Sequence, residues 1–194
     1  MRILTVRQPW AWAIIHGGKD VENRVRNIAG DYRGPVLIHA AQQVDLAAFS
    51  GQSAPLTAAA TAFNASNTDV LKSGPWHSHR GEIIGVVDLV DVHHGPEHGG
   101  GCHKLNSPLP VTPTYDLCSP WGEAGAHHMV LADPRALDQP IPYRGALGLR
   151  KTEFDVIGDY LAAPWGHPKG QTCTPMGCEP GCHLEPVGRL VATS

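Results

Sequence analysis

The chain lacks three features that mark common classes of protein: a long apolar run, a basic leader followed by an apolar segment, and a surplus of positive charge. Its longest apolar stretches, at residues 83–92 and near residue 60, are too short or too polar to cross a bilayer. Without a leader, we expect a cytoplasmic protein that has reduced cysteines and no membrane partner. A formal net charge of −3 argues against a protein that coats DNA along its length.

The sequence also contains no internal repeat, and its 194 residues are most simply one domain followed by a tail. Hydrophobic residues make up 42% of the chain, which is enough to bury a core. Short β-rich segments are separated by loops rich in glycine and proline, which is typical of a β-rich α+β fold. We expect strands at residues 2–6, 36–40, 83–92, 128–132 and 146–149.

Three segments between or after these strands have helical character. Residues 10–15 are a short apolar run, and residues 44–63 look mainly helical, with Pro55 expected to divide them into two short helices. Apolar residues recur at helical spacing in residues 153–161, so we expect a third helix there.

The segment RQPWAWAIIHGGKDVENR, residues 7–24, carries the clearest local signals. Pro9 favours a helix start, the apolar run after it favours a buried helix, and a pair of glycines ends that helix. Lys19 follows this turn directly. In the strand-like residues after it, Glu22 and Arg24 share a face because side chains alternate along a strand. The segment therefore predicts a pocket at a helix-to-strand junction.

The side chains at this junction allow more than one chemistry. A lysine beside Trp10 at the lip of an apolar pocket can bind phosphate or, once desolvated, act as a base or nucleophile. Glu22 can orient Lys19 or act as an acid or base, and Arg24 offers a planar fork to a phosphate. The alternative is a partly buried ion-pair network that pins the turn. If Lys19 serves a ligand instead, we expect an exposed pair, so that replacing Lys19 with alanine costs little stability.

The motifs RQPWA and GxKxxExR resemble the opening signature of the ASCH domain family, which belongs to the PUA-like superfamily. Residues 33–41, 81–92 and 119–149 resemble later segments of the same family in the same order. The resemblance covers about residues 1–150. It implies a small PUA-like β-barrel with flanking short helices, and it leaves residues 151–194 as a Pro/Gly/Cys-rich extension with a short helix and a loop-rich tail.

The resemblance also implies binding of RNA or DNA, recognition of modified nucleobases, or binding of a nucleotide or nucleoside. One bacterial group that this chain resembles hydrolyses N4-acetylcytidine with a lysine, a threonine and a glutamate. Lys19 matches that lysine, but Glu22 stands where the threonine is expected. A covalent mechanism would lack its hydroxyl, whereas hydrolysis by a water activated by Glu22 stays open. Lys19 and Glu22 are accordingly the catalytic candidates.

Charge is unevenly distributed along the chain. Residues 1–34 carry six basic and three acidic side chains, so the remainder is acidic. A positive patch on an acidic protein suits local capture of phosphate beside a selective pocket. The alternative is a set of ordinary solvated surface charges.

Aromatic residues supply the base-stacking candidates. Trp10 and Trp121 each adjoin a proline in a motif segment near charged residues, whereas Trp12 lies in an apolar run and is expected in the core. His39 ends an apolar strand, where a histidine is more often a satisfied core group than a catalyst. The expected ligand-binding set is Gln8, Trp10, Lys19, Glu22, Arg24, His39 and Trp121.

A second chemical signal lies in the cysteines and histidines. Cys173, Cys178, Cys182 and His183 form C-x4-C-x3-CH, and a separate loop supplies His93, His94, His98, Cys102 and His103. Thiolates and imidazoles are zinc ligands, so the tail quartet, or its cysteines with Cys102 or a loop histidine, predicts a structural zinc site. The alternative is a mobile tail with reduced cysteines.

Together these observations favour a nucleic-acid-binding protein that recognises RNA or a modified nucleobase in a pocket at the first helix-to-strand junction. An amidohydrolase acting on an acylated nucleoside is the first alternative, so whether the protein is an enzyme is left open. A protein-interaction adaptor acting through its acidic, histidine-rich loop and tail is the second.

Overall fold

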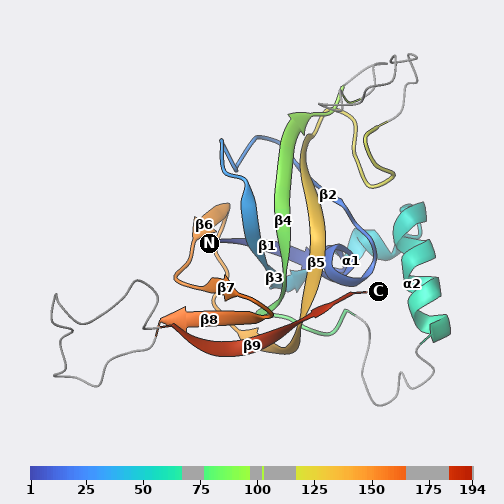
Figure 1. Ribbon diagram of the computed structural model, residues 1–194. Coiled ribbons are helices and arrows are strands. Elements are labelled where there is room, and N and C mark those ends of the chain that lie inside the picture. Colours follow the sequence, from blue (N-terminus) through green and yellow to red (C-terminus); the bar gives the residue numbers. More distant parts are fainter. Residues whose placement is uncertain (67–76, 97–101, 103–116, 165–183, 194) are drawn as a thin grey trace, which may run out of the picture.

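A computed structural model describes residues 1–66, 77–96, 102, 117–164 and 184–193 (Figure 1). The described residues form nine strands, two α-helices and one 3-10 helix. In chain order the elements are β1 (Arg2–Gln8), α1 (Trp10–His16), β2 (Val21–Arg24), β3 (Gly34–Val44), η1 (Leu46–Ser50), α2 (Ala54–Ser66), β4 (Glu82–His94), β5 (His127–Pro142), β6 (Leu149–Lys151), β7 (Asp155–Ile157), β8 (Tyr160–Pro164) and β9 (Leu184–Ala192). Neither described α-helix is long and apolar enough to span a membrane.

The strands form one sheet in the order β6-β1-β3-β4-β5-β9-β8-β7, and β2 pairs with β5 outside this path. The β1–β3 pair is parallel, and the other pairs are antiparallel. The mostly β fold with short helices is therefore confirmed. The expected closed barrel is wrong for the described residues, because the sheet path ends at β6 and β7, which do not pair with each other.

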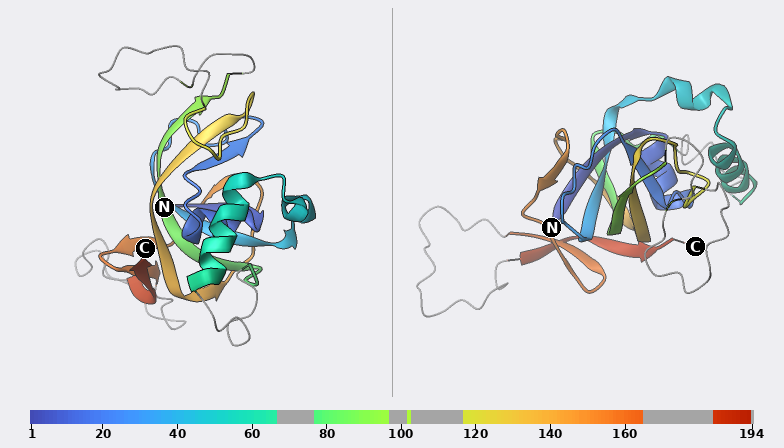
Figure 2. Two further views of the ribbon diagram at one scale, coloured as in Figure 1. Left: turned by 90° about the vertical axis from the view of Figure 1, so that its right-hand side faces the viewer. Right: turned by 90° about the horizontal axis from the view of Figure 1, so that it is seen from above.

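The long strand β5 explains why the sheet stays open. Its first residues pair with β2, whereas Arg135 to Leu137 pair with β9. The outer edge of β5 is thus shared by two strands, and β9 leads the sheet away towards β8 and β7. Three register shifts between β4 and β5 also bend this pair, since bulges increase local twist. Figure 2 shows the two strands curving over the side on which α1 and α2 lie.

The main core lies between α1 and the curved sheet. It includes Leu4, Ile14, Ile15, Ile38, Val87 and Met129. Close approach of the helix depends on Gly85 of β4, because a Cβ atom there would lie 2.8 Å from Ile15 Cδ1 and 2.5 Å from the Arg135 carbonyl oxygen. A helix packed this tightly fixes the position of whatever follows its last turn.

The start and stop signals around α1 are largely confirmed. Pro9 precedes the first helical residue, and the backbone N–H groups of Gly17 and Lys19 both donate to the carbonyl oxygen of Ala13 at 2.9 Å. Of the two glycines, only Gly18 adopts the left-handed conformation, with a φ of 69°. The turn therefore places Lys19 directly beside the end of the helix.

Two helix predictions need correction. The expected pair of short helices in residues 44–63 exists as η1 and α2, but Pro55 does not divide them. It lies in the first turn of α2, where its missing N–H costs no hydrogen bond. The helix expected at residues 153–161 is wrong, because β7 and β8 form a hairpin that turns at Gly158, which has a φ of 57°.

The C-terminal strands share an apolar core with the first part of the chain. Leu161 and Leu190 are buried in one cluster with Ile3, Leu37 and Leu137. In addition, β9 pairs with β5 through Leu137 and Leu190. The described residues after position 150 therefore pack on the sheet formed by those before it.

Replacing Leu161 by alanine measures how much this shared core contributes. Leu161 is fully buried, so we expect the variant to lose about 2–5 kcal/mol of the free energy of unfolding in a urea titration. The matched change Ile157→Ala truncates a side chain that is 51% exposed, and should cost about 0.5 kcal/mol or less. Equal losses in the two variants would contradict the described packing of the hairpin.

Candidate functional site

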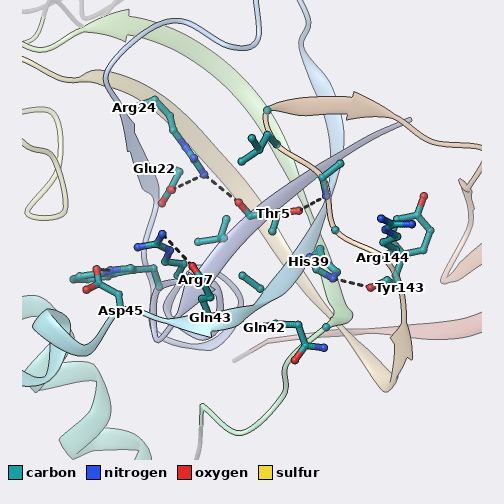
Figure 3. A pocket seen from close by; sticks show the side chains of 18 of the residues that line it. Thr5, Arg7, Glu22, Arg24, His39, Gln42, Gln43, Asp45, Tyr143 and Arg144 are labelled. Carbon is teal, nitrogen blue, oxygen red and sulfur yellow. Dashed lines mark hydrogen bonds and ion pairs between the residues drawn. The ribbon is translucent and has the colours of Figure 1, made fainter.

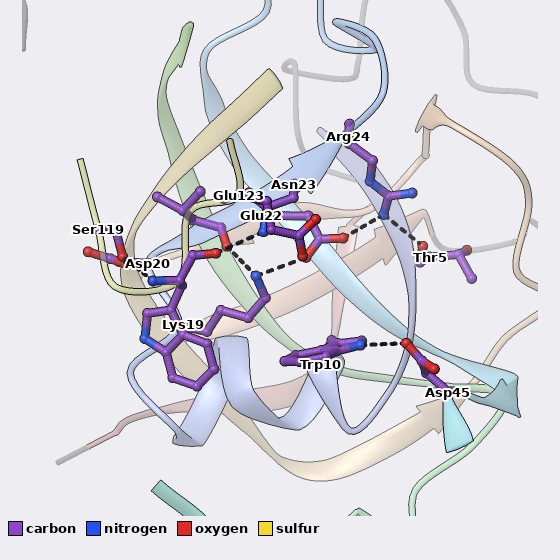
Figure 4. Close-up of polar contacts among 12 residues, drawn as sticks. Thr5, Trp10, Lys19, Asp20, Glu22, Asn23, Arg24, Asp45, Ser119 and Glu123 are labelled. Atoms are coloured by element: carbon purple, nitrogen blue, oxygen red, sulfur yellow. Dashed lines mark hydrogen bonds and ion pairs between the residues drawn. The ribbon is translucent and has the colours of Figure 1, made fainter. Parts of the chain in front are cut away.

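Lys19, Glu22 and Arg24 meet where α1 ends and β2 begins (Figure 4). The Lys19 Nζ atom lies 3.4 Å from Glu22 Oε2, and Arg24 Nη2 lies 3.0 Å from Glu22 Oε1. Each oxygen of the carboxylate is therefore engaged by a different cation. Arg24 Nη2 also donates to the carbonyl oxygen of Thr5 at 3.4 Å, which links β2 to β1.

This ion-pair network is buried, and the expectation of an exposed pair is wrong. Lys19 is 5% exposed and Glu22 is 8% exposed, whereas the Arg24 side chain keeps 28% of its surface. The Lys19 ammonium donates to the carbonyl oxygen of Val21 as well. It also lies 5.7 Å from the ring centroid of Trp10 and 5.8 Å from that of Trp121. Two aromatic rings thus shield the ammonium from water.

Two cavities meet at this network and share Trp10, Glu22 and Asp45 as lining residues. The larger has a volume of about 1010 Å³, and the smaller of about 610 Å³. The larger one is shown in Figure 3, and its polar lining includes Arg7, Arg24, His39, Tyr143 and Arg144. The smaller one is lined by Lys19, Asn23, Trp121 and Glu123, and by residues of η1 and the start of α2.

Trp10 and Trp121 are each held by polar contacts. The indole Nε1 of Trp10 donates to Asp45 Oδ2 at 2.9 Å. The amide nitrogen of Asn23 donates to the Trp121 carbonyl oxygen at 2.8 Å, and Ser119 Oγ donates to Asp20 Oδ1. The loop before β5 is therefore pinned to the start of β2, which positions the backbone of Trp121, and the ring of Trp10 is held directly by Asp45.

The remaining two residues of the expected ligand-binding set lie farther from the network. His39 lines the larger cavity, and its Nε2 donates to the Tyr143 carbonyl oxygen at 3.0 Å. Burial lowers the pKa of His39, so a neutral ring is favoured. Gln8 lines neither described cavity, because its amide bridges the His79 carbonyl oxygen and the Trp12 backbone N–H, each at 3.0 Å.

Several lining residues carried no local signal in the sequence. Arg7 lies in the first motif, but Asp45, Tyr143 and Arg144 come from the ends of β3 and β5. Sequence separation hides their proximity, since only the pairing of β3, β4 and β5 brings those strand ends to one place. The one usable signal was Asp45, whose position before an alanine-rich segment is typical of a helix N-cap.

The basic residues of the first 34 positions do not form one patch. Arg7, Lys19 and Arg24 line the cavities. Arg2, in contrast, lies over the Tyr32 ring at 5.0 Å, and Arg33 pairs with Asp91 at 3.7 Å. The local positive charge available to a ligand is therefore smaller than the sequence count indicates.

The metal ligands expected in the tail, Cys173, Cys178, Cys182 and His183, lie outside the described residues, as do His98 and His103. The described residues contain a different cluster that could hold a metal ion. Its members are His93, Cys102, Cys118 and His128, whose ligand atoms all lie within 4.8 Å of one another. His93 and Cys102 belong to the loop signal seen in the sequence, whereas Cys118 and His128 belong to neither sequence signal and were missed.

Known protein families support the motif resemblance. The family model of the ASCH domain matches residues 4–137, which is more than half of the chain. The chain therefore belongs to the ASCH domain family. No curated protein matches it.

Two substitutions compare how much Glu22 and Lys19 each contribute to the stability of the protein. Glu22→Gln leaves two cations without their carboxylate, so we expect a loss of about 3–5 kcal/mol in the free energy of unfolding. Lys19→Met should cost less than half as much, because Glu22 keeps its pair with Arg24. Chemical denaturation measures both values.

The matched control is Arg33→Met, which breaks the half-exposed pair with Asp91 and should cost about 0–1 kcal/mol. A Lys19→Met variant less stable than Glu22→Gln would contradict the central position of the carboxylate.

Proposed function

We propose that this ASCH-domain protein binds a single-stranded nucleic acid or a nucleotide, with a base in the smaller cavity and a phosphate in the larger one. One observation carries the proposal: a buried ion-pair network separates a cavity walled by two tryptophans from a cavity lined by three arginines. Membership of the ASCH family, in which RNA binding is expected, supports the same conclusion.

The smaller cavity suits a nucleobase. Trp10 and Trp121 offer flat apolar faces, and stacking on such a face contributes about 1–3 kcal/mol per base. Lys19 and Glu22 line the same cavity, so a cation and a carboxylate stand beside the place of the base. A donor next to an acceptor matches the mixed polar edge of a nucleobase, whether or not the base is modified.

The larger cavity suits a phosphate. Arg24 is oriented by Glu22, and Arg7 and Arg144 line the same cavity. Asp45 and Glu22 offset part of this charge, so the cavity can neutralise only a few phosphates. We therefore expect a shallow dependence of affinity on salt, since each phosphate neutralised on a single strand contributes a logarithmic slope of about −0.7.

Hydrolysis of an acylated nucleoside is a second candidate, favoured by the buried Lys19–Glu22 pair on the wall of the smaller cavity. Glu22 would take a proton from water as the water adds to the acyl carbon. The C–N bond would then break, and the departing amine would take the proton. We prefer the binding function because both oxygens of Glu22 are already paired with cations, which suits a structural role better than the role of a base. The adaptor alternative concerns segments that lie mostly outside the described residues.

Affinity for a labelled short single-stranded RNA, followed by fluorescence anisotropy at several salt concentrations, tests the binding proposal. Trp121→Ala should weaken binding by about 5-fold to 150-fold, the equivalent of one lost stacking contact. Arg24→Ala should weaken binding and make the salt slope shallower by about 0.7. The matched control Arg26→Ala removes the same charge from an exposed residue that lines neither cavity, and should change affinity little.

Equal effects of Arg24→Ala and Arg26→Ala would show that binding is a diffuse charge effect and would contradict the proposed pocket. A parallel incubation with N4-acetylcytidine, analysed by chromatography, addresses the second candidate. Release of cytidine that is lost in Glu22→Gln would replace the binding proposal with hydrolysis.

A further inference from the structure

Four metal-ligating side chains converge where β4 ends and β5 begins. These two strand ends lie side by side (Figure 1). His93 and His128 are cross-strand partners in the register of these two strands, so their side chains share one face of the sheet. Cys102 and Cys118 approach the same face from the connection between the strands. We infer that His93, Cys102, Cys118 and His128 form a structural zinc site.

Hydrogen bonds to the far side of each imidazole point its free nitrogen at the cluster. The Nδ1 atom of His93 lies 2.7 Å from Asp91 Oδ2, and a carboxylate oxygen only accepts, so Nδ1 carries the proton. The lone pair on Nε2 then faces Cys118 Sγ at 3.3 Å. A carboxylate that orients the outer nitrogen of a histidine is the usual support of a zinc-bound imidazole.

In His128 the two ring nitrogens exchange roles, so that Nδ1 rather than Nε2 faces the cluster. Its Nε2 donates to the Glu123 carbonyl oxygen at 2.8 Å, which leaves the lone pair on Nδ1. That atom lies 3.1 Å from Cys118 Sγ and 3.4 Å from Cys102 Sγ. Gly95 leaves room for the ring, because a Cβ atom at this position would come within 2.7 Å of it. Two independent supports therefore aim two ring nitrogens at Cys118 Sγ, and one of these nitrogens also lies close to Cys102 Sγ.

The spacing of these atoms fits a tetrahedral zinc ion. Zinc–sulfur and zinc–nitrogen bonds of about 2.3 Å and 2.0–2.1 Å place neighbouring ligands roughly 3.3–3.8 Å apart. Three nitrogen–sulfur distances in the cluster are 3.1–3.4 Å, and all four ligand atoms lie within 4.8 Å of one another, so small movements would bring them to the spacing of a zinc site. Two thiolates and two imidazoles favour zinc, and four protein ligands leave no position for a substrate.

A disulfide between Cys102 and Cys118 is the main competing state, and both cysteines are free here. A disulfide would remove both S–H donors. The lone pairs of His93 and His128 would then face a sulfur bridge without a proton or a cation between them, and His128 is completely buried. The two oriented imidazoles are thus better explained by a metal ion than by an oxidised pair.

The zinc site would also brace the wall of the smaller cavity. Cys118 lies three residues before Trp121, in the loop that Ser119 and Asn23 attach to the start of β2. A metal bond at Cys118 would fix the other end of this loop to β4 through His93. This inference does not depend on what the cavity binds.

Zinc content of the full-length protein, measured by plasma mass spectrometry after expression with added zinc and dialysis, tests the inference. We expect about one zinc per chain, lost in Cys118→Ser and in His93→Ala. His94→Ala is the matched control, because His94 is exposed and packs on His127 on the opposite face of the sheet. A triple serine replacement of Cys173, Cys178 and Cys182 should also keep the metal.

A second measurement uses the wild-type protein, so that the test does not depend on whether the variants fold. Wild-type protein stripped by a chelator should take up Co²⁺ and develop the thiolate charge-transfer band and the intense visible bands of a tetrahedral site. Hydrogen exchange in residues 117–126 should rise on chelation and return to its first value when zinc is restored. Wild-type protein that neither carries zinc nor binds Co²⁺, a Cys102–Cys118 disulfide in its place, or zinc lost only from the tail variant would overturn the inference.

Discussion

The Glu22 carboxylate, buried between Lys19 and Arg24, is the interaction on which the rest of the site depends. A carboxylate with so little water around it needs compensating charge, and the two cations supply it from opposite sides. Lys19 is fixed by the end of α1, and Arg24 reaches across to β1. The network therefore joins a helix and two strands into a rigid wall with a cavity on either side.

Local chemistry made the first part of this arrangement predictable. Pro9, the apolar run and Gly18 define a helix and its end, and alternation along a strand places Glu22 beside Arg24. The burial of the network was not predictable in the same way, because Trp121 and Asp45 come from distant segments. Whether an ion pair is exposed depends on the residues that pack over it, and these can be distant in the sequence.

The other errors have the same origin. Phe154, Ile157 and Leu161 have helical spacing, but the left-handed turn at Gly158 and the pairing of β8 with β9 favour a hairpin. The sheet does not close into the expected barrel because one edge of β5 pairs with two strands. Cys118 and His128, two members of the proposed zinc site, escaped notice because a tetrahedral cluster needs only proximity in space. His93 and His128 meet through strand register rather than through a short sequence motif.

The central claim is that a nucleobase lies against Trp10 and Trp121, beside the buried network. Photo-crosslinking of a single-stranded RNA that contains 4-thiouridine, followed by mass spectrometry of the linked peptides, tests it most directly. We expect the crosslinks to fall on the peptides that contain Trp10 and Trp121. Crosslinks that avoid both tryptophans and fall instead on the remote strands β7, β8 and β9 would contradict the claim.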